Sequence, residues 1–89
     1  MKVVISVIGK DSVGIIAKVS AVCSECGVNI ADITQSVLQD MFVMVMMAEF
    51  GDGSSTLTDF SDRLAALAAA LGVDIRVMRK DIFDSMHRI

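Results

Sequence analysis

The sequence predicts an α+β sandwich in which a four-stranded antiparallel sheet carries two helices on one face. The first observation is that apolar residues change period along the chain, from the alternation of a strand to the spacing of a helix and back. The second is that Gly9 and Gly51 each follow a strand-like segment. The third is that Gly-Val-Asn-Ile at 27–30 matches Gly-Val-Asp-Ile at 72–75, each after a helical pattern. Two similar halves therefore follow one another.

The first half begins with a strand and a helix. Residues 1–8 are rich in β-branched side chains, which predicts a strand. Apolar residues then recur at helical spacing, which predicts a helix over 13–26 that ends at Gly27. Either Asp11 or Ser12 is the expected N-cap, because their side-chain oxygens accept hydrogen bonds from free backbone N–H groups. The apolar stripe of this helix comprises Ile15, Val19, Val22 and Cys26.

Two strands are predicted next, joined by a turn at 39–40. Residues 29–39 alternate loosely between polar and apolar, as expected of a half-exposed strand. Residues 41–50 differ because both faces are apolar, which predicts a central strand that is covered on both sides. Its two faces are Met41, Val43, Val45 and Met47 on one side and Phe42, Met44, Met46 and Ala48 on the other.

The second half repeats the pattern of the first. A loop over 51–55 precedes a second helix that Gly72 ends, and residues 73–78 alternate as a fourth strand. The short tail 81–89 places its apolar residues on one helical face. The stripe of the second helix is Leu57, Phe60, Leu64, Leu67 and Leu71, and that of the tail is Ile82, Phe83, Met86 and Ile89.

This βαββαβ order is that of the ferredoxin-like sandwich, and we expect one domain over 1–80 followed by the tail 81–89. The sheet face without helices poses a problem. One apolar side of the strand 41–50 must lie on it, and a row of apolar side chains in water exceeds the patches that monomers tolerate. The tail, a second copy of the chain or a ligand is expected to cover it.

Composition excludes several classes of function. The chain has 89 residues and a formal net charge of −3, and its eight Lys and Arg form no basic run, which argues against direct binding of nucleic acid. Its longest apolar runs, 41–48 and 64–71, are shorter than the roughly 20 residues that span a membrane. Without an evident leader, the sequence predicts a cytoplasmic protein that neither crosses nor binds a membrane.

The residues that most often carry chemistry favour a non-enzyme. Cys23 and Cys26 have the spacing of redox and metal sites, but they end a helix, where the dipole raises rather than lowers a thiol pKa, so we expect core residues. His87 is the single histidine, which excludes a zinc cluster or a Ser-His-Asp triad within one chain. Asp81 and Asp84 flank the apolar stripe of the tail and are expected on a solvated face. No cofactor or metal is expected.

One pair of segments suggests a ligand. The loop 9–15 is expected to face 27–30. Gly14 lets the backbone approach closely where free N–H groups favour a carboxylate, Asp11 suits an ammonium group, and Asn29 both donates and accepts. Together they suit an α-amino acid. The alternative is structural: Asp11 caps the helix, Gly14 permits packing and Asn29 takes a turn conformation. Spacing alone leaves both open.

These same segments resemble the ACT domain, a regulatory ligand-binding module of amino-acid metabolism. The motifs are Gly-Lys-Asp-Ser-Val-Gly-Ile at 9–15, Ala-Lys-Val-Ser at 17–20 and Gly-Val-Asn-Ile at 27–30, and the element order extends the match over about 1–80. Where many members have Arg-Pro before the glycine, this chain has Ser12 and Val13. The chain is similar to small stand-alone ACT proteins such as the glycine-cleavage repressor group.

The resemblance implies a homodimer, with sheets often joined side by side. It also implies an amino acid or related metabolite held between the first loop of one protomer and the second strand of the other. Carried over by position, the ligand-binding residues are Asp11, Ser12, Val13, Gly14 and Ile15 from one protomer and Asn29 and Ile30 from its partner. We therefore expect a regulatory binding module without catalysis, and as the alternative a protein–protein interaction module that binds no metabolite.

Overall fold

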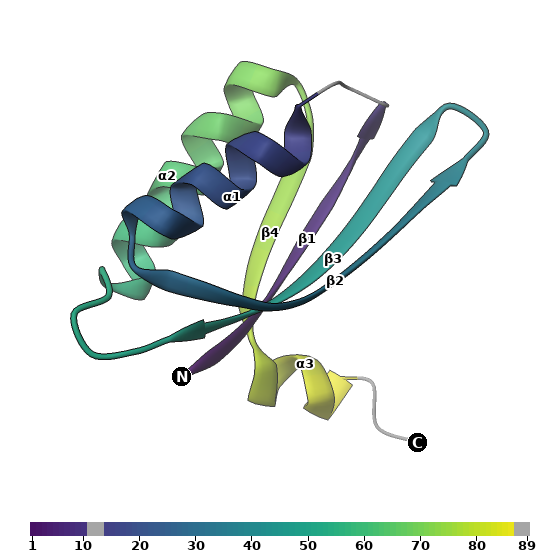
Figure 1. Ribbon diagram of the computed structural model, residues 1–89. Helices are drawn as coiled ribbons and strands as arrows, with labels where there is room; N and C mark the ends of the chain where they lie inside the picture. The colour runs from purple at the N-terminus through teal and green to yellow at the C-terminus, as the bar shows by residue number, and fades with distance from the viewer. Residues whose placement is uncertain (11–13, 87–89) are drawn as a thin grey trace.

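A computed structural model describes residues 1–10 and 14–86 of the chain. These residues form four strands and three helices in the order βαββαβα (Figure 1). The elements are β1 (Lys2–Lys10), α1 (Ile15–Glu25), β2 (Val28–Leu38), β3 (Met41–Phe50), α2 (Leu57–Leu71), β4 (Asp74–Arg79) and α3 (Lys80–Met86).

The sheet has the strand order β2-β3-β1-β4, and every neighbouring pair is antiparallel. Helices α1 and α2 lie side by side on one face, α1 toward β2 and α2 toward β4 (Figure 1). This arrangement confirms the predicted ferredoxin-like sandwich. Among the described helices, none has the length and apolar character needed to span a membrane.

The core lies between the sheet and these two helices. Odd-numbered residues of β1 and even-numbered residues of β3 share the helix-facing side, because Val3 is paired with Ala48 and Val7 with Met44. Phe60 of α2 is fully buried and meets the ring of Phe50 edge-on, with centroids 5.4 Å apart. The buried core cluster comprises Val3, Ile5, Val7, Ile15, Val19, Cys23, Cys26, Val28, Phe42, Met44, Met46, Ala48, Phe60 and Leu64.

The two main helices begin differently. Thr56 is the N-cap of α2, where its hydroxyl accepts a hydrogen bond from the backbone N–H of Asp59 at 3.1 Å. The N-cap of α1 is Gly14, in a left-handed conformation with φ of 89° and no side-chain cap bond. The prediction of Asp11 or Ser12 as N-cap is therefore wrong, because the N-cap position belongs to Gly14. Asp11 and Ser12 themselves lie outside the described residues.

Strand β3 was expected to be covered on both faces, and that expectation is wrong for a single chain. Its even-numbered residues are buried, whereas Met41 and Val45 on the other face keep 47% and 37% of their surface exposed. Helix α3 packs on this open face, but against β1 and β4 rather than β3. Its own apolar residues Ile82 and Met86 are 48% and 65% exposed. The open face thus stays only partly covered.

Strand β2 is an edge strand and is more exposed than the sequence predicts. From Ala31 to Leu38 every residue is exposed, because this half of the β2–β3 hairpin extends beyond the helices (Figure 1). A register shift between Ile30 and Asp32 separates this half from the part beneath α1. Ile33 and Val37 therefore present apolar side chains to solvent.

Candidate functional site

The first loop contributes one described backbone feature to the candidate site. Gly14 has a φ of 89°, and a Cβ placed on it would meet no atom of residues 1–10 or 14–86 within 4 Å. Glycine is therefore favoured here by backbone conformation rather than by close packing. No described side chain fills this space, which would allow a ligand to approach the backbone. Asp11, Ser12 and Val13 of the same prediction lie outside the described residues.

Helix α1 begins directly after Gly14 and carries no acidic side chain in its first turn. The N–H groups of a first helical turn have no partner within the helix, and together with the helix dipole they favour an anion such as a carboxylate. Ile15 itself is 2% exposed and belongs to the core. A ligand at this helix end would therefore contact the backbone of Ile15 and not its side chain.

The second half of the candidate site starts β2. Asn29 is exposed and is paired with Glu49 on the open face of the sheet, whereas Ile30 is half-buried on the helix face opposite Ala48. Asn29 is thus free to use its amide as donor and acceptor. Ile30 can supply apolar contact beside it.

One chain does not bring these two halves together. Gly9 is paired with Phe42 and Asn29 with Glu49. These two partners are seven positions apart on β3, so Gly9 and Asn29 are separated by about 24 Å along the strand direction. Helix α1 carries the chain from the end of β1 back along the sheet, and β2 starts at the opposite end (Figure 1). The expectation that loop 9–15 faces 27–30 within one chain is therefore wrong.

The cysteine pair is buried, as expected of core residues. Cys23 and Cys26 are 1% and 2% exposed, and both are free thiols. The pKa of Cys23 is raised to about 11, mainly by burial and also by the nearby Cys26, while a hydrogen bond with backbone partly offsets these two effects. A thiol with so high a pKa remains protonated and a poor nucleophile at neutral pH.

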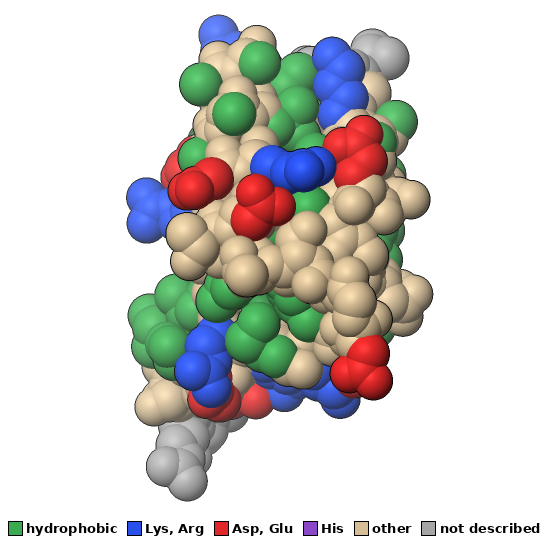
Figure 2. Space-filling view, turned by 90° about the vertical axis from the view of Figure 1, so that its left-hand side faces the viewer, with side chains coloured by type: hydrophobic (Ala, Val, Ile, Leu, Met, Phe, Trp, Pro, Cys, Tyr) green, Lys and Arg blue, Asp and Glu red, His purple; other side chains and the backbone are tan. Residues whose placement is uncertain are grey.

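Several charged side chains of the described residues form ion pairs on the surface. Figure 2 shows acidic and basic side chains side by side on the face that carries the helices. Arg63 of α2 contacts Glu25 of α1 at 3.3 Å and Asp59 at 3.4 Å. Within residues 1–10 and 14–86, no group of three or more His, Cys, Asp or Glu side chains could hold a metal ion.

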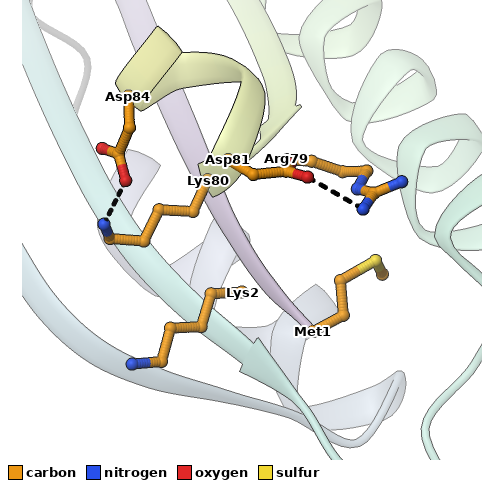
Figure 3. Close-up of a pocket in the computed structure, with 6 residues that line it drawn as sticks. All are labelled: Met1, Lys2, Arg79, Lys80, Asp81 and Asp84. Atoms are coloured by element: carbon orange, nitrogen blue, oxygen red, sulfur yellow. Dashed lines mark hydrogen bonds and ion pairs between the residues drawn. The ribbon is translucent and has the colours of Figure 1, made fainter. Parts of the chain in front are cut away.

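Asp81 and Asp84 lie on the solvated face of α3, as the sequence predicts. They form ion pairs with Arg79 at 3.0 Å and Lys80 at 2.6 Å. These four side chains, with Met1 and Lys2, line a hollow that sequence analysis did not predict (Figure 3). Sequence patterns gave no signal for it, because pairing of β1 with β4 is what brings positions 2 and 80 together. His87 lies outside the described residues.

Comparison with known proteins gives a consistent result. A family model described as the ACT domain matches residues 2–78. The chain is 41% identical over 86 residues to a UPF0237 protein of Methanosarcina acetivorans, which covers 97% of this chain and 94% of that protein. It is 39% identical to a UPF0237 protein of Clostridium acetobutylicum over the full length of both.

Solved structures show the same fold. An ACT domain protein from Streptococcus pneumoniae matches with a TM-score of 0.80 and 37% identity, over 94% of both chains. A putative glycine cleavage system transcriptional repressor matches with a TM-score of 0.75 and 21% identity, over 85% of this chain and 43% of that one. At 21% identity the second match supports the fold alone.

Proposed function

Because the chain belongs to the ACT domain family, we propose that it is a regulatory module that binds a small amino acid or related metabolite between two copies and performs no catalysis. The observation that carries this proposal is the position of the two candidate half-sites at opposite ends of one sheet, next to an unpaired edge strand. A second copy can join the half-sites by pairing along that edge.

The β2 edge has the properties of an interface. It is 11 residues long and contains no Lys and no Pro, the residues that usually protect an edge strand from pairing. Asp32 is its only charge. Its exposed residues Ile33 and Val37 offer apolar area beside the unpaired backbone. An exposed edge of this kind favours pairing with another strand.

Two-fold antiparallel pairing of β2 with its copy would bring the half-sites of the two chains to the same end of the joined sheet. If the axis passes near Ile33, Asn29 of the partner lies opposite Val37. Val37 is in the same row of the sheet as Phe42 and Gly9, at the end where loop 9–15 begins. The partner's Asn29 would thereby lie in the row that ends at Gly9, with β2 and β3 between the two residues.

This arrangement suits the two charges of an amino acid. The first turn of α1 and the open backbone at Gly14 favour the carboxylate. The sequence assigns Asp11 to the ammonium group, and the amide of Asn29 completes the polar contacts. Closure of the loop on the ligand would change the surface that a regulated partner contacts.

Thermal unfolding followed by far-UV circular dichroism tests the proposal, since the chain has no Trp or Tyr for fluorescence. Each common amino acid is added in turn. A ligand at 100 times its Kd adds about 2.7 kcal/mol, a shift on the order of 10 °C for a domain of this size. A shift with one or two amino acids supports the proposal and identifies the ligand, and no shift with any of them contradicts it.

Three variants test the site assignment. Asp11→Ala and Asn29→Ala should each abolish the ligand-dependent shift. Because Asn29 is exposed, and exposed substitutions change stability little, Asn29→Ala should leave the unliganded Tm within about 2 °C. Asp52→Ala removes an exposed carboxylate from the loop before α2 and should keep the shift. Unchanged affinity in both site variants would contradict the assignment.

A second candidate is a protein interaction module that binds no metabolite. The exposed apolar side chains of α3, Ile82 and Met86, favour it. Removal of residues 81–89 should then abolish capture of a partner in a pull-down and leave any amino-acid affinity intact. Normal capture by the shortened chain would count against this candidate.

A further inference from the structure

A hollow lies on the open side of the sheet, where the start of β1, the end of β4 and α3 meet (Figure 3). Its volume is about 410 Å³, within the range of roughly 300–1,000 Å³ typical of small-molecule sites. It lies within one chain, away from the N-terminal end of α1 and off the β2 edge. Its lining residues are Met1, Lys2, Arg79, Lys80, Asp81 and Asp84.

The charge of this hollow is opposite to that of the whole chain. Of the described residues, three Lys or Arg and only two Asp or Glu line it, in a chain of net charge −3. The cations come from two strands and a helix, because Lys2 begins β1, Arg79 ends β4 and Lys80 begins α3. The fold therefore gathers positive charge that the sequence distributes at both ends of the chain.

The hollow also holds more hydrogen-bond donors than its carboxylates use. Arg79 Nη2 donates to Asp81 Oδ2 at 3.0 Å, and Lys80 Nζ donates to Asp84 Oδ2 at 2.6 Å. A guanidinium has five N–H donors and an ammonium three, so both cations keep donors after these bonds. Lys2 makes no ion pair with any described residue and lies beside Lys80 in Figure 3.

We propose that this hollow binds a small molecule carrying phosphate or several carboxylate groups, with Lys2 as its main cationic contact and Arg79 and Lys80 as further donors. The two ion pairs need not break, because each leaves N–H groups available for the ligand. This anion site goes beyond the proposed amino-acid site. It needs no second copy of the chain and none of the residues assigned to amino-acid binding.

The test is a titration of the full chain with pyrophosphate, and separately with citrate, followed by the backbone amide signals in ¹H–¹⁵N NMR at about 0.15 M salt, where weak non-specific attraction is screened. We expect saturable shifts concentrated at Lys2 and at residues 79–81. Lys2→Gln should weaken the binding about fivefold, the size expected for one exposed charge contact. Saturation with pyrophosphate alone assigns phosphate as the ligand group, and saturation with citrate alone assigns carboxylates.

Lys10→Gln is the matched control. Lys10 lies on the same strand and the same sheet face as Lys2, at the far end, and is likewise exposed. Its substitution changes the net charge equally and should leave both titrations unchanged. Asn29→Ala should also leave them unchanged, which separates this site from the amino-acid site. Equal weakening by Lys2→Gln and Lys10→Gln, or no saturable shift with either probe, would overturn the proposal.

Discussion

Gly9 is required by close packing rather than by backbone conformation. A Cβ at this position would lie 2.5 Å from Cγ1 and 2.9 Å from Cβ of Val73, the residue that precedes β4. The motif glycines at 9 and 14 thus have different physical roles, because Gly14 has a left-handed φ and no neighbour within 4 Å among the described residues. Gly9 permits close packing, whereas Gly14 permits a backbone conformation that other residues rarely adopt.

Gly9→Ala should destabilise the protein by about 1–3 kcal/mol, the usual cost of overpacking a tight contact. Urea unfolding followed by circular dichroism measures the change. Val73→Ala in the same chain should recover part of it by removing the nearer methyl group. Gly51→Ala is the control, since a Cβ there meets nothing within 4 Å. An unfolding midpoint equal to that of the unaltered chain would contradict the packing argument.

Cys23 makes stability depend on pH above the neutral range. Burial raises the pKa of this thiol from 9.0 to about 11, so the unfolded chain loses the proton first. The stability that the protonated Cys23 thiol contributes to the folded chain is fully present below pH 9 and is lost as pH rises from 9 to 11. The urea midpoint should fall over this window, and less steeply in Cys23→Ala. If the urea midpoint fell equally with pH in the two proteins, the Cys23 thiol would not contribute to the pH dependence.

At the scale of elements, the proposed dimer depends on the edge strand β2. Ile33 is 39% exposed near the middle of the strand. In the proposed pairing the two copies of this residue lie opposite each other, so Ile33→Lys places like charges together and should give a monomer. Size-exclusion chromatography with light scattering measures the mass.

Ile82→Lys is the control for this variant, because Ile82 on α3 is similarly exposed at 48% and lies off the edge. It should remain dimeric. The opposite result, a dimeric Ile33→Lys and a monomeric Ile82→Lys, would place the interface on the open face and contradict the β2 pairing.

The sequence predicted the elements well because their signals are local. Alternation over 41–50 and the helical stripe ending before Gly72 each lie within one segment, and the boundaries of β3 and α2 follow them closely. The distance between Asn29 and loop 9–15 within one chain could not be predicted. It depends on the register in which β1 and β2 each pair with β3. The hollow beside Lys2 depends on the pairing of β1 with β4 for the same reason.

At the scale of the whole molecule, ligand binding and dimerisation are linked in the proposed function. If the amino acid contacts both protomers, it binds the dimer more tightly than the monomer, and it must strengthen the dimer by the same factor. Sedimentation at several protein concentrations should show a lower dimer dissociation constant with saturating amino acid. An unchanged dissociation constant would indicate a site formed within one protomer.

The strand order has a consequence for the way the chain folds. The β2–β3 hairpin closes through the two-residue turn at 39–40, whereas β1 must pair with β3 and with β4 across most of the sequence. Local pairing forms faster than pairing that closes a long loop. We therefore expect the hairpin to form early and β1 to be inserted late, between strands already present. During this interval both edges of the hairpin are unpaired, so refolding at high protein concentration should favour aggregation through the hairpin.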